Sequence, residues 1–258
     1  MPKSFEGPEG QFQGRVALIT GASSGIGRTT AIAFAEEGAK VAIAARRAAE
    51  SEEIVREIQS KGGEAIFVAT DITKPDHVER LVKTTVDRFG RLDLAFNNAG
   101  VLGTPFVPTP EYAVDTWEQV ISVNLTGVFL SMKYEIPAIL ASGGGAIVNM
   151  SSIAGKVGGG GGIAYYASKH GVIGATKAAA LEFAAKGIRI NAICPAVIKT
   201  EMADQLLAKA EAPILAAHPI GRFGVPEEVS EVVTFLCSKK ASFMTGHAYA
   251  IDGGLLAR

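Results

Sequence analysis

Residues 15–27 read RVALITGASSGIG, an apolar run followed directly by a loop that contains Gly21, Gly25 and Gly27. The run 15–20 has the composition of a buried strand, and Gly25 opens a pattern typical of a helix that continues to Glu37. Glycines at such a junction permit a tight turn and let backbone N–H groups approach a pyrophosphate. The segment therefore predicts a strand, a dinucleotide-binding loop and a helix, and the alternative is a tight turn that binds nothing.

The same alternation of strand and helix patterns continues to the end of the chain. Apolar strands are expected at 41–45, 65–69, 92–97, 146–150, 188–194 and 247–251, with helices at 49–60, 75–89, 115–140, 163–186 and 226–237. Apolar strands separated by helices indicate an α/β fold with a doubly wound parallel sheet, here of about seven strands with helices on both faces. We expect a flexible extension at 1–13 and a single domain at 14–258, with ligands beyond the carboxyl ends of the strands.

Composition excludes several classes of protein. The 258 residues are 48% hydrophobic, and 25 Lys and Arg against 26 Asp and Glu leave a net charge of −1. This balance argues against disorder and against nucleic acid as a partner. Cys194 and Cys237 form no C-x-x-C pair, so neither a disulfide framework nor a metal site is indicated. No apolar run approaches the ~18 residues of a membrane span, and a cytoplasmic protein is expected.

The segment Tyr165-Tyr166-Ala167-Ser168-Lys169 carries the pattern of an acid–base pair. On a helix, residues four apart share a face, so Lys169 is expected beside the phenol of Tyr165. A nearby ammonium lowers the pKa of a phenol, which suits proton transfer near neutral pH. Ser152, just beyond the expected fifth strand, can hydrogen-bond the same reacting oxygen. The alternative is a structural Tyr–Lys pair in the core or on the surface.

The end of the second strand indicates which dinucleotide is bound. It reads Ala45-Arg46-Arg47, with no acid. An acid at this place suits the ribose of NAD, and an arginine suits the 2′-phosphate of NADP. NADP is therefore favoured, with Arg46 as the preferred contact, unless these arginines are only solvated surface charges. Asp71, after the third strand, either accepts a hydrogen bond from adenine or caps a turn.

From about Arg15 to Gly254 the chain resembles the short-chain dehydrogenases/reductases, in a branch similar to 3-oxoacyl carrier-protein reductases and glucose 1-dehydrogenases. The resemblance is carried by the loop TGASSGIG at 20–27, by NNAG at 97–100 and by YxxxK at 165–169. It implies that Ser152, Tyr165, Lys169 and Asn124 are catalytic, with Asn124 supporting a water relay to the lysine. The implied cofactor contacts are Gly21, Ser23, Ser24, Gly25, Ile26, Gly27, Arg46, Arg47, Asp71, Ile72, Asn98, Ala99, Gly100, Tyr165, Lys169, Pro195, Val197 and Thr200.

The expected reaction is hydride transfer between the nicotinamide of NADP(H), or NAD(H), and a small carbonyl compound, secondary alcohol or sugar-like polyol. A 3-oxoacyl carrier-protein substrate is the alternative, although Lys133 is the single basic residue between Asn124 and Ser152. A non-catalytic dinucleotide sensor and a lyase or isomerase on the same fold are two further alternatives. The small residues of 175–185 and the resemblance together imply a homotetramer.

Two features of the sequence depart from the family pattern. Ala196 stands where the family usually has glycine, and five consecutive glycines occupy 158–162 on the loop expected to line the substrate pocket. A glycine run offers no side chains and much backbone freedom, so an open, mobile substrate side is expected. The four histidines, His218 among them, have no acid or cysteine at ligand spacing and are expected to be structural. Trp117 is expected in the core or at an interface.

Overall fold

A seven-stranded parallel sheet runs through the centre of the molecule, whose computed structural model describes residues 10–257. Its strand order is β3-β2-β1-β4-β5-β6-β7, which confirms the predicted doubly wound fold. The strands are β1 (Val16–Thr20), β2 (Lys40–Ala45), β3 (Ala65–Ala69), β4 (Leu94–Asn97), β5 (Gly145–Met150), β6 (Ile188–Pro195) and β7 (Ala248–Ile251). None of the helices in the described part of the chain is long and apolar enough to cross a membrane.

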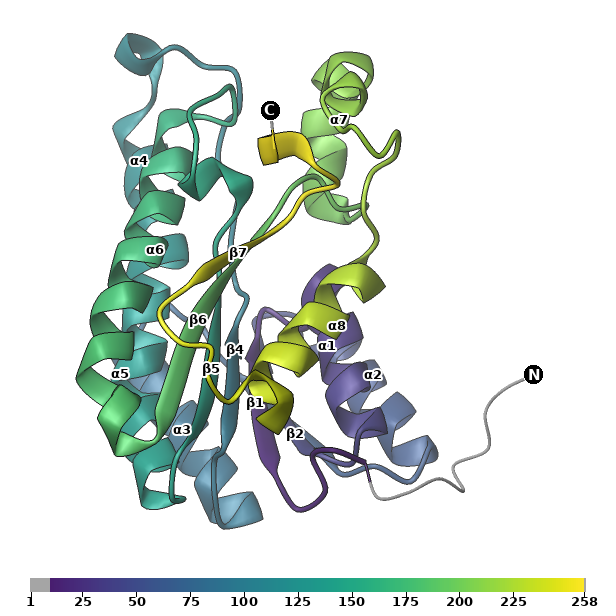
Figure 1. The fold of residues 1–258 in the computed structure, drawn as a ribbon, viewed down its shortest axis with the longest axis vertical. Coiled ribbons are helices and arrows are strands. Elements are labelled where there is room, and N and C mark those ends of the chain that lie inside the picture. Colours follow the sequence, from purple (N-terminus) through teal and green to yellow (C-terminus); the bar gives the residue numbers. More distant parts are fainter. Residues whose placement is uncertain (1–9, 258) are drawn as a thin grey trace.

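Helices cover both faces of this sheet (Figure 1). Their bounds are α1 (Gly25–Glu36), α2 (Ala48–Ser60), α3 (Pro75–Phe89), α4 (Val114–Ile121), α5 (Gly127–Ala141), α6 (Ile163–Phe183), α7 (Glu201–Ala216) and α8 (Pro226–Cys237). Buried side chains of α1, α2 and α8 form one core with the sheet, and those of α3, α5 and α6 form a second core on the opposite face. The strands β1, β2, β4, β5 and β6 are almost wholly buried because they are apolar on both sides, whereas the edge strands β3 and β7 are partly exposed.

The folded domain begins earlier than predicted. Residues 1–9 of the expected extension lie outside the described residues, but residues 10–13 form a turn against α1. Phe12 is buried against the ring of Phe34, and its N–H donates to the carbonyl oxygen of Glu37. The prediction of a flexible extension is therefore wrong for residues 10–13, because one aromatic side chain anchors them to the core.

The helix expected at 115–140 is interrupted. It comprises α4, a π-helical turn over Ser122–Thr126 and α5. The N-cap residue is Ala113, and Asp115 lies in the first turn, where the helix dipole favours negative charge. Helix α7 was not predicted at all. It has no buried residue and is kinked at Ala210, so its sequence lacks the apolar period of a core helix.

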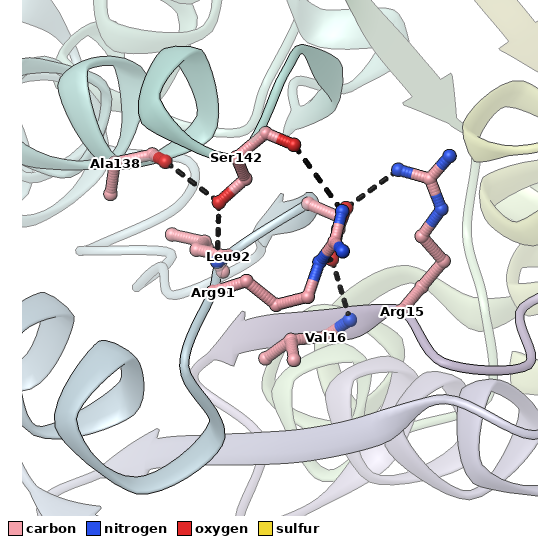
Figure 2. Close-up of polar contacts among 7 residues, drawn as sticks. Arg15, Val16, Arg91, Leu92, Ala138 and Ser142 are labelled. Atoms are coloured by element: carbon pink, nitrogen blue, oxygen red, sulfur yellow. Dashed lines mark hydrogen bonds and ion pairs between the residues drawn. The ribbon is translucent and has the colours of Figure 1, made fainter.

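The amino ends of β1 and β4 are joined by a buried carboxylate (Figure 2). Asp93, which precedes β4, has no exposed side-chain surface and accepts hydrogen bonds from Arg15, from Arg91 and from the N–H of Val16, at 2.6, 2.6 and 2.9 Å. The guanidinium of Arg91 continues to the carbonyl oxygen of Ser142 after α5. This cluster lies at the end of the sheet opposite the expected ligand edge and fixes the register there.

A second buried network joins the other end of β4 and β5 to two helices. The side-chain amide of Asn97 donates to Glu135 of α5 and to Asn149 of β5, both at 3.0 Å, and Asn149 donates to Thr176 of α6 at 3.0 Å. Burial raises the pKa of Glu135 to about 7, against the hydrogen bond from Asn97. Because of this raised pKa the side chain is a neutral acid below about pH 7, and its other carboxyl oxygen has no hydrogen-bond partner.

Replacing Glu135 should change how stability depends on pH. The folded state keeps the Glu135 proton up to about pH 7, whereas an unfolded chain releases it near its ordinary pKa, so wild-type stability should fall between about pH 5 and 8. That difference in pKa corresponds to about 3 kcal/mol. Glu135→Gln should remove this part of the dependence in urea unfolding at pH 5, 6, 7 and 8, and exposed Glu118→Gln should keep it. Equal pH dependence in wild type and Glu135→Gln would contradict the assignment.

Candidate active site

One large cavity opens at the carboxyl ends of the strands, where the doubly wound fold places ligands. Its volume is about 1310 Å³, above the 300–1,000 Å³ typical of a pocket for one drug-sized ligand. It extends from Arg46 and Asp71 past the glycine loop to Tyr165 and α7. All of the predicted cofactor residues except Gly27 line it, and Ser152 lines it as well. The cavity has room for a dinucleotide together with a small substrate.

The glycine loop is held close to the loop after β4. Gly21 has a left-handed φ of 65°, and a Cβ there would lie 2.6 Å from the Cα of Ala99. The side-chain amide of Asn98 donates to the carbonyl oxygens of Thr20 and Gly21, both at 3.0 Å, and the Thr20 hydroxyl accepts from the N–H groups of Asn98 and Ala99. Thr20 therefore belongs to this site, although the sequence motifs did not predict a role for it.

Gly27 and Ser24 show how α1 begins. A Cβ on Gly27 would lie 2.5 Å from the carbonyl oxygen of Gly21, so Gly27 lets the helix pack beneath the loop and does not line the cavity. Ser24 is the N-cap residue, but its side chain makes no capping bond. The first N–H groups of α1 therefore lack a side-chain cap, which is the arrangement that binds a phosphate at a helix N-terminus. These features fit a pyrophosphate.

Two arginines and an aspartate form the wall beside β2 and β3. The guanidinium of Arg47 donates to the hydroxyls of Ser23 and Ser24 at 3.1 and 2.6 Å and lies 3.4 Å from a carboxylate oxygen of Glu201. Asp71 caps a turn by accepting from the N–H and hydroxyl of Thr73. Burial raises the pKa of Asp71, but these bonds and the charge of Arg46 outweigh it, so the net pKa is lowered.

Ser152, Tyr165 and Lys169 meet in the cavity beyond β5, as predicted. The hydroxyl of Ser152 hydrogen-bonds that of Tyr165. The ammonium of Lys169 lies 5.5 Å from the centre of the Tyr165 ring and donates to the carbonyl oxygen of Met150 at 2.9 Å. Tyr166 turns its hydroxyl away, toward Gly159 and Gly161. This constellation can hold and transfer a proton at a substrate oxygen.

The prediction that Lys169 lowers the pKa of Tyr165 is wrong, because the structure raises that pKa. Burial raises the pKa of Tyr165, and the hydrogen bond from Ser152 opposes that rise only in part. Burial also lowers the pKa of Lys169, to about 8. Both side chains are buried in the same part of the cavity wall. The free-energy cost of desolvating their charged forms exceeds the electrostatic stabilisation that each was expected to give the other.

Asn124 lies in the π-helical turn, below the cavity wall. It exchanges two hydrogen bonds with the backbone of Val101, at 2.8 and 2.9 Å, and donates to the hydroxyl of Ser168 at 3.2 Å. It does not itself line the cavity. A Cβ on Gly100 would lie 3.4 Å from Asn124 and 3.7 Å from the Lys169 ammonium, so Gly100 separates the two polar groups without filling the space between them.

The five glycines at 158–162 do not leave the substrate side open. The carbonyl oxygen of Gly160 accepts from the N–H of Phe106, and a Cβ on Gly160 would lie 2.8 Å from the Phe106 ring. A Cβ on Gly159 would overlap the hydroxyl of Tyr166. The expectation of an open loop is therefore wrong for residues 159–162, where side chains or backbone of the same chain occupy the adjoining space, whereas Gly158 borders open space.

The remaining wall of the cavity comes from α7, which the sequence did not predict. Thr200 is its N-cap residue, and Met202, Leu206 and Ile214 face the cavity from it. The wall is thus mainly apolar opposite Tyr165. Within residues 10–257, no group of three or more His, Cys, Asp or Glu side chains could hold a metal ion.

Comparison with known proteins agrees with this geometry. Residues 21–256 match a family model described as enoyl-(acyl carrier protein) reductase. The chain is 48% identical to a cyclohexanol dehydrogenase from Acinetobacter sp. (strain SE19), over 96% of this chain and 97% of the relative. It is 41% identical to a 3-oxoacyl-[acyl-carrier-protein] reductase from Synechocystis sp., over 94% and 97%.

A solved structure shows the same fold. The crystal structure of levodione reductase superposes with a TM-score of 0.90 at 36% identity and covers 95% of this chain and 99% of that one. The sheet order, the glycine loop and the Ser152–Tyr165–Lys169 group are thus found in a chain that matches these relatives from end to end. The chain belongs to the short-chain dehydrogenase/reductase family of NAD(P)-dependent oxidoreductases.

Proposed function

We propose that this enzyme interconverts an alicyclic secondary alcohol and its ketone with NADP(H). The observation that carries the proposal is the meeting of Ser152, Tyr165 and Lys169 opposite the apolar wall of α7. Such a wall suits a ring of CH₂ groups, and polar contacts are concentrated at the one reacting oxygen. The relatives named for cyclohexanol and for cis-4-hydroxycyclohexanecarboxylate, 48% and 43% identical, support a six-membered ring as substrate.

In this proposal Tyr165 transfers the proton of the substrate oxygen. When bound, the nicotinamide supplies or accepts the hydride. Ser152, already hydrogen-bonded to Tyr165, orients the same oxygen. Lys169 is fixed by the carbonyl oxygen of Met150, which places its charge near the phenol and the loop after β4. Asn124 holds the backbone at Val101 and supports a water that passes the proton to Lys169.

Replacing the phenol of Tyr165 should impair proton transfer without impairing the binding of NADPH. Tyr165→Phe removes the proton donor and should lower kcat for cyclohexanone reduction by about 10²- to 10⁴-fold, the usual contribution of general acid catalysis. Binding of NADPH, followed by its fluorescence, should remain. Tyr166→Phe is the matched control, because its hydroxyl faces the glycine run, and it should keep kcat within a few-fold. Full activity in Tyr165→Phe would refute the proposed role.

The preference for NADP(H) rests on Arg46 and Arg47, which both line the cavity directly after β2. Arg47 already binds the two serines of the glycine loop, so Arg46 is the guanidinium left for a 2′-phosphate. The charge of Arg46 also acts on the Asp71 carboxylate, and this nearness supports a role for Arg46 beside the adenosine. Ser23, Ser24, Ile26, Ile72, Pro195, Val197 and Thr200 are the further contacts proposed along the dinucleotide.

Charge reversal tests this preference. Arg46→Asp should lower kcat/KM for NADPH by about 10- to 100-fold, the range expected when a charged hydrogen bond is lost, and leave NADH little affected. Arg56→Asp, on the exposed face of α2 and outside the cavity wall, is the control and should change neither value. A wild type with a higher kcat/KM for NADH than for NADPH would overturn the NADP assignment.

A carrier-linked 3-oxoacyl substrate is the second candidate. It is favoured by the 41% and 39% identical reductases of that name from Synechocystis and Thermotoga maritima. Docking an acidic carrier requires basic side chains near the site, and α4 to β5 offers only Lys133. Comparison of an acyl carrier thioester with cyclohexanone decides between the two substrates. NADPH oxidation coupled to loss of either one excludes a sensor, a lyase and an isomerase.

A homotetramer is the proposed assembly, because apolar side chains are exposed on two separate faces. Trp117, Phe129 and Leu181 lie on α4, α5 and α6, and Leu181 is 85% exposed. Phe235 of α8, which covers the other face of the sheet, and Phe243 before β7 are exposed as well and are proposed as the second patch. Two self-complementary patches on one chain generate a closed tetramer of two-fold symmetry.

Light scattering tests the assembly. Wild type should have about four times the mass of one chain, and Leu181→Lys should reduce it to dimers, because a buried ammonium at a two-fold interface meets its own copy. Glu53→Gln on the exposed face of α2 makes the same +1 charge change outside both patches and should leave the mass unaltered. A wild-type monomer would contradict the proposal.

A further inference from the structure

Phe106 is held in a left-handed backbone conformation in the lining of the active-site cavity. Its φ is 65°, and no other residue except glycine has a positive φ in the part of the chain that the structure describes. A bulky side chain rarely adopts this region, because its Cβ crowds the neighbouring carbonyl oxygen. Conformations of this kind persist only where surrounding contacts hold them, and they are concentrated at functional sites.

Contacts with the glycine run hold both the backbone and the ring of Phe106. Its N–H donates to the carbonyl oxygen of Gly160 at 2.8 Å, and a Cβ on Gly160 would lie 2.8 Å from two carbon atoms of the ring. Two residues earlier, the N–H of Thr104 donates to the hydroxyl of Tyr112 at 3.3 Å. A Cβ on Gly162 would lie 2.7 Å from the carbonyl oxygen of Thr104. The glycines thus supply the space in which this segment is seated.

Burial does not compensate for the unfavourable conformation. Phe106 is 46% exposed, so its ring gains only part of the free energy that a buried aromatic side chain provides. Among the large hydrophobic side chains exposed within residues 10–257, Phe106 and Met202 are the two that line the cavity. An apolar ligand that covered the ring would remove this surface from water, which is favourable. The ring is therefore available to an apolar ligand in the cavity.

The glycine run also connects the Phe106 ring with the reacting phenol. Gly160, which seats Phe106, and the next residue, Gly161, both line the cavity. A Cβ on Gly161 would lie 3.8 Å from the ring of Tyr165. Neighbouring Cα atoms are about 3.8 Å apart, so the two aromatic rings approach the same short segment of loop. A substrate whose oxygen is held by Tyr165 therefore has its carbon skeleton within reach of Phe106.

We propose that Phe106 is a specificity-determining residue whose ring packs against the apolar face of a cyclic substrate while Tyr165 holds the reacting oxygen. This inference rests on the proposed action on ring alcohols and ketones, and it names the side chain that favours a ring over an open chain. An aromatic ring matches the broad face of a six-membered ring, whereas a short open-chain ketone leaves part of it in water. Gly160 is a positioning residue, because it acts through the Phe106 ring.

Substitutions at Phe106 test its contact with the substrate. Kinetics with NADPH compare cyclohexanone with butan-2-one, and wild type should have the higher kcat/KM for the ring. Phe106→Ala and Phe106→Gly should lower the ratio of the two kcat/KM values by about tenfold, mainly through KM, because one or two CH₂ groups lose an apolar contact. Phe106→Leu should restore part of the ratio. An unchanged ratio in the alanine and glycine variants would overturn the inference.

Urea unfolding distinguishes the loss of a contact from the loss of the fold. Glycine adopts a φ of 65° without steric cost and alanine does not, so Phe106→Gly should have a higher urea midpoint than Phe106→Ala. At an unstrained loop position the order is the reverse, because alanine restricts the unfolded chain. A higher midpoint for Phe106→Ala would therefore contradict the strained backbone on which the proposal depends.

The glycine run supplies a second pair of variants. Gly160→Ala should displace the Phe106 ring and lower the same substrate ratio, and it should have no further effect when combined with Phe106→Gly. Gly158→Ala is the matched control, because its Cβ would meet no atom within 4 Å, and it should keep the ratio. Additive effects of Gly160→Ala and Phe106→Gly would show that Gly160 does not act through the ring.

A binding measurement decides the contact without turnover. In the NADP⁺ complex of Tyr165→Phe labelled with ¹³C-phenylalanine, the ring resonances of Phe106, assigned by their loss in Phe106→Leu, should shift with cyclohexanone and much less with butan-2-one. This shift without reduction of either ketone by wild type would refute the proposed function and leave the contact standing. Turnover of cyclohexanone without the shift would overturn the role of Phe106 alone, and the absence of both would refute both.

Discussion

Hydrogen bonds between the carboxyl ends of β1, β4 and β5 are the constraint on which the rest of the site depends. The Thr20 hydroxyl and the Asn98 amide join the glycine loop to the loop after β4. Asn97 and Asn149 join β4 to β5 beneath them. Catalysis tolerates displacements of only a fraction of an ångström, so residues contributed by three strands require such cross-links. The protein meets this requirement with buried amides, which bond in two directions at once.

Glu135 extends the same constraint from the sheet to the helices. It binds Asn97 from α5, and through Asn149 the network reaches Thr176 of α6, the helix that carries Tyr165 and Lys169. Lys169 returns to β5 through the carbonyl oxygen of Met150. The catalytic helix is thus tied to the sheet at two points two turns of helix apart. A neutral carboxylic acid serves here because a charged one would lack a counter-charge in this core.

Features encoded locally were predictable from the sequence. Apolar strands, the glycine loop at 20–27 and the Tyr165–Lys169 spacing each depend on neighbours along the chain, and the structure places them as expected. The β3 strand and the helices that begin at Pro75 and Pro226 have the predicted bounds, and for α3 proline marks the start and Gly90 the end. Pro75 and Pro226 take the first helical position, where a missing N–H costs nothing.

Features set by tertiary contacts were not predictable. Helix α7 has no apolar period because its residues face a cavity and not a core. Which of Arg46 and Arg47 binds the glycine loop depends on the direction in which the chain leaves β2. The partner of Glu135 comes from a strand 38 residues earlier.

The packed glycine run also determines where this enzyme can acquire new substrates. Side chains at Gly159 and Gly160 would collide with Tyr166 and Phe106, and Gly162 has a left-handed φ of 88°. Side chains introduced at residues 159–162 must therefore displace these rings or strain the backbone. Helix α7 has no buried residue and contributes Met202, Leu206 and Ile214 to the cavity, so it can be varied without opening voids in the core. Within one fold, the tolerance of mutation and the capacity to change specificity thus reside in the same helix.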